Sequence, residues 1–292
     1  MTMEEAKPQS IPGQAAAALP ELVTFRNVTK SFGEGPHARV AIKDVSFIVH
    51  DLPNVGELIA IVGPSGCGKS TLLRIIAGLA PHFPPTLGDV IVFGKPIEKA
   101  SADRGVVDQK YSLLPHLTVL DNIAFGLMLR DMSRRERRDR ALEWAKKVGL
   151  EGSEDKYPSE LSGGMQQRVS IAATLILQPK ILLMDEPFGA LDPKIRLQMQ
   201  ELLVRLWNEQ QGTVFIVTHS IEEAVYLGDR VFRMATNPGR LVEIVSVPRP
   251  NESPEVMRKR PEFTQMTQEL LRRLEADAPA LGELPGRQAW AK

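Results

Sequence analysis

Short apolar runs along the chain alternate with longer stretches in which the apolar residues have helical spacing. The runs at residues 58–62, 181–184 and 214–217 contain no polar side chain, as expected for strands that are covered on both faces. Residues 72–76 have helical spacing and follow the first run after a glycine-rich loop. Because buried strands that alternate with helices form a parallel sheet, the pattern predicts an α/β fold with a mostly parallel sheet.

Two strand-like segments precede these runs, at residues 22–25 and 45–49, with a turn-rich stretch at 33–36 between them. Residues 1–20 combine prolines with a run of alanines and are interpreted as a flexible leader. Glu4 and Glu5 stand where a signal peptide carries positive charge, and the apolar tract at 14–19 is too short for its apolar core. We therefore expect the folded chain to begin near residue 21.

The chain becomes helical and charged between about residues 112 and 160, with no convincing strand. Ser133 and Glu136 have the spacing of a capping box and predict the start of a helix. Acidic residues are interleaved with the arginines of this stretch. That mixture favours a solvated helix face over a contact with nucleic acid.

Prolines interrupt the chain from about residue 248, and an amphipathic helix is predicted after them. Its apolar stripe consists of Phe263, Met266, Leu270 and Leu274. We expect this stripe to pack on the body of the protein, and a regulatory or dimer contact is the alternative. Residues 249–292 are accordingly expected to form a C-terminal extension with one helix.

The composition limits the partners and the compartment of the protein. Among 292 residues, 36 Lys and Arg balance 36 Asp and Glu, which argues against binding nucleic acid or anionic lipid by bulk charge. The single cysteine, Cys67, excludes an internal disulfide and favours a reducing compartment. No charge-free apolar stretch reaches the roughly 18 residues of a membrane span. We expect a cytoplasmic protein that reaches a membrane only through a partner.

The first motif with recognisable chemistry follows the run at 58–62. It matches the phosphate-loop pattern G-x-x-x-x-G-K-[ST], and its residues are Gly63, Pro64, Ser65, Gly66, Cys67, Gly68, Lys69 and Ser70, with Thr71 next. Glycines let backbone N–H groups turn inward around an anion, and the following helix directs its positive end to the same place. Lys69 is expected to reach the β- and γ-phosphates of a nucleotide, and Ser70 to bind Mg²⁺.

A pair of carboxylates, Asp185 and Glu186, follows the run at 181–184. Ligands bind at the carboxyl ends of strands in open α/β sheets, so the pair is expected near the phosphate loop. Asp185 suits the hydration shell of Mg²⁺, and Glu186 is suited to orient or deprotonate a water molecule. A simple helix cap is the minor alternative for the pair.

A third motif lies about twenty residues earlier, at 161–168, and reads Leu-Ser-Gly-Gly-Met-Gln-Gln-Arg. Its two glycines precede a predicted helix, which makes a second site for an anion. One chain does not need two phosphate-binding helix ends. The motif is explained if it serves a nucleotide held by another copy of the chain.

Together these motifs resemble the ATP-binding subunits of ABC transporters, over residues of about 21–248. The third motif resembles the signature of that family, and further matches follow in the family's order. They are Phe32 for stacking on adenine, Gln109 in the loop before the helical region, Gly189 to Asp192 as the D-loop, and His219 as the switch histidine. The resemblance implies a P-loop NTPase core, an antiparallel β subdomain and a helical subdomain at about 112–164.

The resemblance also implies roles for these residues in a sandwich of two copies around two ATP molecules. Ser162, Gly163 and Gly164 would complete the γ-phosphate site of the partner copy, and Asp192 would also belong to the nucleotide-binding residues. Glu186 would be the catalytic base, His219 would contact the γ-phosphate, and Gln109 would sense Mg²⁺ and the attacking water. Ordinary packing on an edge strand remains the alternative for Phe32.

Less specific strings are similar to importers of the nitrate, sulfonate and taurine class. They lie at 103–107, 113–122 and 237–250, and they imply a membrane permease as partner and, indirectly, a solute-binding protein. The protein would then lie on the inner face of the membrane through its permease. Asp108 and His116 depart from the usual pattern of that class.

Two other functions compete with transport at this point. A soluble ABC ATPase that acts on nucleic acid is one, although such proteins usually carry a long coiled coil or two cassettes. A P-loop kinase is the other, although it has no use for the signature. The position of Cys67 inside the phosphate loop predicts that alkylation blocks hydrolysis and that nucleotide protects against it.

Overall fold

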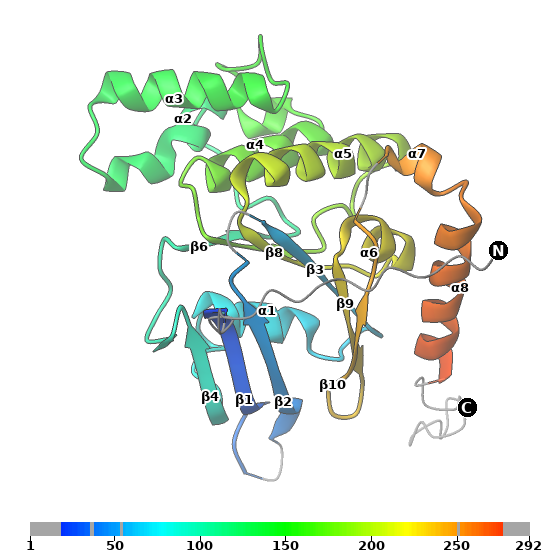
Figure 1. Ribbon diagram of the computed structural model, residues 1–292. Helices are drawn as coiled ribbons and strands as arrows, with labels where there is room; N and C mark the ends of the chain where they lie inside the picture. The colour runs from blue at the N-terminus through cyan, green and yellow to red at the C-terminus, as the bar shows by residue number, and fades with distance from the viewer. Residues whose placement is uncertain (1–18, 36–37, 53–54, 250–251, 277–292) are drawn as a thin grey trace, which may run out of the picture.

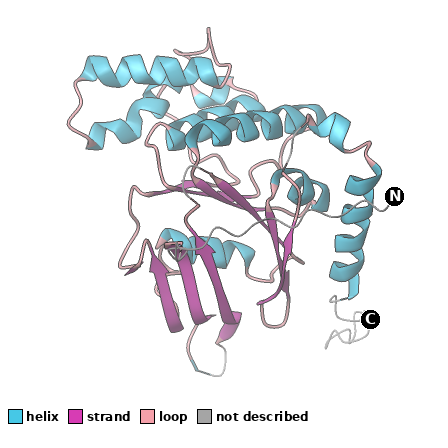
Figure 2. Cartoon of the chain, viewed as in Figure 1, coloured by secondary structure: helices cyan, strands magenta, loops and turns pink. Residues whose placement is uncertain are grey.

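The computed structural model describes residues 19–35, 38–52, 55–249 and 252–276. The expected leader therefore lies outside the described residues, apart from its last two positions. Within the described part the chain forms two sheets and a set of helices, shown in Figures 1 and 2. No described helix combines the length and the apolar character that crossing a membrane requires.

The larger sheet is mostly parallel, as the sequence predicts. Its strand order is β10-β9-β3-β8-β7-β6, and only β10 runs antiparallel to its neighbour. The strands span β3 Glu57–Val62, β6 Arg104–Val107, β7 Ile181–Asp185, β8 Thr213–Val217, β9 Arg230–Ala235 and β10 Arg240–Ser246. The three continuous apolar runs thus form β3, β7 and β8 at the centre of the sheet.

The smaller sheet is antiparallel, with strand order β2-β1-β4-β5. It consists of β1 Glu21–Phe32, β2 Arg39–His50, β4 Leu87–Val92 and β5 Lys95–Pro96, and its long strands lie at the lower left of Figure 1. Its apolar side chains share a core with helix α1 (Lys69–Ala77) and with one face of the parallel sheet. Ile59 and Ile61 of β3 belong to this core.

The opposite face of the parallel sheet packs against the remaining helices. Leu58, Ala60 and Val62 of β3 point to this second core, which follows from the alternation of side chains along a strand. The core is closed by α5 (Pro193–Gln210), α6 (Ile221–Leu227) and the helical region. Burial on both faces explains why the central strands are apolar at every position.

The helical region occupies the top of the molecule in Figure 1. It comprises α2 Val119–Ala124, η2 Phe125–Leu129, α3 Arg134–Lys147, η3 Pro158–Glu160 and α4 Gly163–Leu175. The capping box of Ser133 and Glu136 is present at the start of α3. Only Ala141 and Ala145 of α3 are buried, so its arginines lie on a solvated face as expected. Helix α4 runs through the predicted boundary at residue 164 and packs on both α2 and β6.

The C-terminal helix α8 (Pro261–Ala276) packs on α6, at the right of Figure 1. Phe263 and Leu270 are buried, and Met266 and Leu274 are partly buried against the same core. The predicted stripe therefore packs on the protein's own body. A short helix, α7 (Pro254–Met257), precedes it, so the described extension contains two helices where the sequence predicts one.

Candidate active site

The chemistry-bearing residues lie at the carboxyl ends of β3, β7 and β8, which are adjacent parallel strands. The phosphate loop follows β3, the pair Asp185 and Glu186 ends β7, and His219 follows β8. Each strand delivers one group to the same edge of the sheet, the usual place for a ligand in this class of fold.

The backbone of the phosphate loop is shaped for an anion. Gly66 and Gly68 have φ values of 78° and 90°, and a Cβ on Gly68 would lie 2.3 Å from Cγ2 of Ile42. Gly68 caps α1 without a side-chain hydrogen bond, and the first turn of α1 carries no acidic residue. The first N–H groups of this helix are therefore available to a bound phosphate.

The side chain of Lys69 folds back onto the start of the same loop, and the residue is 5% exposed. Its Nζ donates to the carbonyl oxygens of Gly63 at 2.9 Å and Pro64 at 3.1 Å. Two predicted site residues, Gly63 and Pro64, thus act through their backbone in this structure. An ammonium group held at this point faces the place where the loop would hold phosphate.

Cys67 contributes its backbone to the loop, while its side chain points into the protein. The side chain is completely buried, and burial raises the pKa of the thiol, although the nearby Lys69 opposes that shift. The structure corrects the expectation of a thiol open to alkylation, because neither access nor a thiolate at neutral pH is provided.

Ser70 and Asp185 form the other side of the phosphate site. Ser70 Oγ donates to Asp185 Oδ1 at 2.8 Å, and the guanidinium of Arg74 lies 3.9 Å from Oδ2. Burial raises the pKa of the Asp185 carboxyl, and the hydrogen bond from Ser70 works in the opposite direction. A hydroxyl and a carboxylate are oxygen ligands of the kind that Mg²⁺ prefers, so the donor set fits the expected metal.

The described residues contain no cluster of three or more His, Cys, Asp or Glu side chains that could hold a metal ion. Mg²⁺ commonly takes one or two protein oxygens and completes its shell with water and substrate phosphates.

The carboxylate of Glu186 connects the two remaining predicted residues. Its Oε1 lies 2.5 Å from Nε2 of His219, and its Oε2 accepts from Nε2 of Gln109 at 3.3 Å. A carboxylate can accept a hydrogen bond from a ring N–H, so this contact suits the His219 tautomer that carries its proton on Nε2. The sequence names these three residues but does not show that one carboxylate joins them.

These groups border a cavity of about 390 Å³. It is lined by Phe32, Arg39, Ala41, Ser65, Gly66, Gly68, Lys69, Ser70, Thr71, Glu186 and His219. Phe32 is one of these lining residues, so the residue predicted to stack on adenine shares a cavity with the phosphate loop.

Three residues near this cavity were not predicted from the sequence. Arg39 and Ala41 reach it from β2, and no motif marks them. His82 contacts the ring of Phe32 edge-on, at 5.2 Å between ring centroids. His82 and Phe32 are far apart in the sequence and come into contact only when the chain folds.

The signature residues lie outside this cavity. Ser162 caps α4 by accepting from the N–H of Met165 at 3.3 Å, and Asp192 caps α5 by accepting from Ile195 at 3.1 Å. Ser162 and Gly163 are exposed, whereas Gly164 is buried against α5. One chain therefore brings together the phosphate loop, Asp185, Glu186, Gln109 and His219, but not Ser162, Gly163, Gly164 or Asp192.

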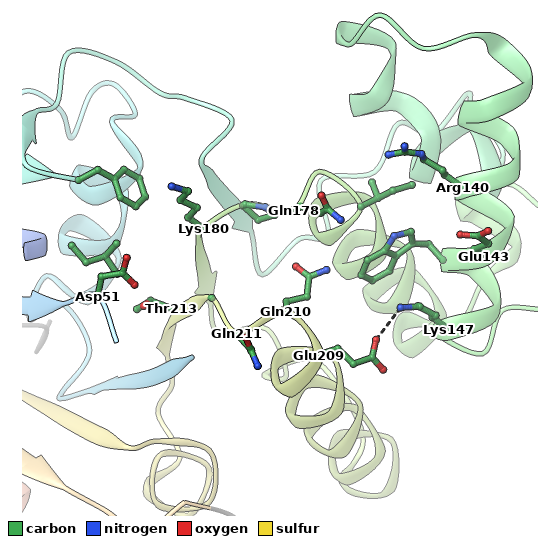
Figure 3. A pocket seen from close by; sticks show the side chains of 16 residues that line it. Asp51, Arg140, Glu143, Lys147, Gln178, Lys180, Glu209, Gln210, Gln211 and Thr213 are labelled. Atoms are coloured by element: carbon green, nitrogen blue, oxygen red, sulfur yellow. Dashed lines mark hydrogen bonds and ion pairs between the residues drawn. The ribbon is translucent and has the colours of Figure 1, made fainter. Parts of the chain in front are cut away.

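A larger cavity, of about 910 Å³, lies at the opposite edge of the sheet (Figure 3). It is bordered by Lys180 and Thr213, at the starts of β7 and β8, and by α3. Lys147 and Glu209 form an ion pair across it at 2.9 Å. It contains none of the motif residues, so the smaller cavity is the candidate active site.

Comparison with known proteins identifies the family of this site. Residues 42–189 match the family model described as ABC transporter. The taurine import ATP-binding protein TauB of Rhizobium johnstonii is 52% identical over 69% of this chain and 74% of its own length. The aliphatic sulfonates import ATP-binding protein SsuB of Bacillus cereus is 41% identical over 76% of this chain and 85% of its own.

A solved structure gives the same result for the fold. The dimeric structure of an ATP-binding cassette in a post-hydrolysis state, bound to ADP and Pi, superposes with a TM-score of 0.68. It is 36% identical and covers 78% of this chain and 99% of its own. The comparisons favour the transporter reading over the nucleic-acid and kinase alternatives. The chain belongs to the ABC transporter family as an ATP-binding, ATP-hydrolysing protein with the fold of an ABC ATPase cassette.

Proposed function

We propose that this protein is the ATP-hydrolysing subunit of an importer for taurine, a sulfonate or a similar small solute such as nitrate. The relatives that support this class are named as import ATP-binding proteins for taurine and for aliphatic sulfonates. The ATPase does not need to contact the solute, which a permease and a solute-binding protein would select.

The observation that carries the ATP-hydrolysing part of the proposal is the carboxylate of Glu186 between Gln109 and His219, in the cavity of the phosphate loop. Each carboxylate oxygen keeps a further lone pair after these contacts. Glu186 would use it to take a proton from the water that attacks the γ-phosphorus of ATP. Gln109 and His219 would orient the carboxylate and stabilise the phosphoryl group.

The remaining residues of the cavity would bind the nucleotide. Phe32 would stack on the base, the N–H groups of the loop would surround the phosphates, and Lys69 would approach the β- and γ-phosphates. Ser70, Asp185 and Gln109 would hold Mg²⁺. That ion supplies charge neutralisation on the phosphate oxygens when it is bound.

A second copy of the chain would complete each site. The exposed Ser162 and Gly163, with the backbone of Gly164 and with Asp192, lie away from the cavity of their own chain. They remain available to a nucleotide held by the partner copy. The solved relative is a dimer, which supports a homodimer around two nucleotides.

The permease would dock on the surface at residues 109–120 and the adjoining part of the helical region. A cavity of about 400 Å³ lies there between β6 and α2, and Phe125, Met128 and Leu129 expose apolar side chains beside it. Asp108, the departure from the usual pattern, accepts from Ser112 at 3.0 Å within the chain. Docking there would hold the protein on the inner face of the membrane.

The first prediction tests Glu186. Glu186→Gln should lower the rate of ATP hydrolysis by about 10²–10⁴-fold, because a positioned base contributes roughly that factor. ATP binding, measured by fluorescence titration with a nucleotide analogue, should be retained. Glu143→Gln, in the remote cavity of Figure 3, is the matched control and should hydrolyse ATP normally. Full turnover by Glu186→Gln would refute the assigned role.

A further inference from the structure

Glu223 of α6 is a buried carboxylate that takes no part in the reaction described above. Its side chain is in contact with three polar groups and is 5% exposed as a residue. Oε2 accepts from Thr218 Oγ1 at 2.5 Å, and Oε1 accepts from Gln200 Nε2 at 3.1 Å. Oε1 also lies 3.7 Å from Nε of Arg196.

Burying this carboxylate is unfavourable unless its partners compensate. Burial raises the pKa of Glu223, while the hydrogen bond from Thr218 and the positive charge of Arg196 act in the opposite direction. Gln200 and Thr218 are themselves almost completely buried. Glu223 is thus the centre of a small buried polar network.

The network holds the backbone on both sides of His219. Thr218 Oγ1 donates to Glu223 and accepts from the backbone N–H of Ser220 at 3.0 Å. Ser220 Oγ in turn accepts from the backbone N–H of Glu223 at 3.2 Å, which starts α6. Thr218 and Ser220, which flank His219, are therefore both hydrogen-bonded to Glu223. The His219 side chain extends from this turn to Glu186.

The same carboxylate connects His219 with the loop at 189–192. Arg196 donates through its second terminal nitrogen to the carbonyl of Leu191 at 3.0 Å. Its Nε lies beside Glu223. Gln200, one turn further along α5, also contacts Glu223. Helix α5 starts directly after Asp192, and Arg196 is the side chain of α5 that contacts both Leu191 and Glu223.

We propose that Glu223 is a positioning residue that fixes His219 against Glu186 through Thr218 and couples His219 to the loop that carries Asp192. The inference rests on the proposed function, because it requires His219 to assist hydrolysis. Glu223 contacts neither nucleotide nor water in this scheme and acts through Thr218 and His219 alone.

The test compares two variants of Thr218. Thr218→Val keeps the shape of the side chain but removes the hydroxyl, so His219 loses one restraint on its backbone. Turnover should fall by roughly ten- to a hundredfold, the effect expected of a misplacement of about 1 Å at a reacting centre. KM for ATP should stay unchanged, since the phosphate loop is untouched. Thr218→Ser retains the hydroxyl and should restore turnover.

A double variant separates positioning from general damage. Thr218→Val in a His219→Ala background should cause no further loss of turnover, because the restraint acts through the histidine. Glu222→Gln, on the exposed side of the same helix, is the matched control and should hydrolyse ATP normally. If Thr218→Val does not fold, as judged by thermal melting, Glu223→Gln provides the same comparison.

Three outcomes would overturn the inference. They are normal turnover in Thr218→Val and Glu223→Gln, an equal loss in the His219→Ala background, and no recovery with Thr218→Ser. Normal turnover in His219→Ala alone would instead contradict the role that the proposed function gives to His219. The two failures are therefore distinguishable.

Discussion

At Glu186 the backbone adopts a φ of 49°, a conformation that costs a residue other than glycine about 1–3 kcal/mol. The strained residue directly follows β7, and its backbone N–H donates to Val217 of β8 at 3.0 Å. The Glu186 side chain extends to Gln109 and His219. The strained backbone therefore lies at the residue on which the proposed chemistry depends.

Cys67 gives a prediction at this scale. The folded protein should resist N-ethylmaleimide at neutral pH, because the thiol is buried and its raised pKa leaves little thiolate. Raising the pH should increase the labelling rate only above the usual range of a free thiol, since the thiolate forms later. Mass spectrometry of the labelled protein measures this rate.

The unfolded chain in guanidinium chloride is the control for Cys67 and should be labelled quickly. Fast, complete labelling of the native protein at neutral pH would contradict the buried position of the thiol. ATP should have little effect on the labelling rate of Cys67, whereas the position of Cys67 in the sequence predicted that nucleotide would protect it.

At the scale of elements, the sequence predicted the three central strands β3, β7 and β8 and parts of β1 and β2, and it missed others, among them the charged strand β9. β3, β7 and β8 are recognisable because both faces are buried. β9 contains Arg230 and Arg233, which pair with Glu57 at 2.5 Å and Glu243 at 3.0 Å. Those ion pairs form only in the folded chain, so the local pattern does not reveal a strand.

The candidate site was also predicted only in part from the sequence. Its motifs were predicted, but the contacts between them depend on the order of the strands.

Helix α8 provides a prediction at this scale, since its packing on α6 depends on few side chains. Leu270 is 1% exposed and its neighbour Leu271 is 46% exposed. Leu270→Ala should lower the free energy of unfolding by about 2–5 kcal/mol, from the lost burial and the cavity left behind. Leu271→Ala should change it by less than about 0.5 kcal/mol. Urea denaturation followed by circular dichroism measures both, and equal effects would contradict the packing of α8.

At the scale of the whole molecule, each proposed reaction site has two parts. One part is the cavity of the phosphate loop, and the other would be the exposed signature residues of a second copy. The phosphate loop and Glu186 share a cavity, whereas Ser162 lies on another part of the surface. Because the formal net charge is zero, two copies neither repel nor attract each other through their net charge. A bound nucleotide, whose phosphates can meet the start of α4 in the partner, would supply the attraction instead.

This arrangement predicts that pairing depends on ATP and on the charge at residue 162. In a Glu186→Gln background, where ATP is not consumed, light scattering should detect a dimer with Mg-ATP and a monomer without it. Ser162→Asp should abolish this dimer, because its carboxylate would face the γ-phosphate of the partner's nucleotide. Asp and Asn cap helices as well as Ser does, so Ser162→Asn keeps α4 and should still pair. Each monomer should bind ATP normally, since Ser162 lies outside the cavity of its own chain. Equal pairing of the Asp and Asn variants would show that α4 does not meet the nucleotide of a second copy.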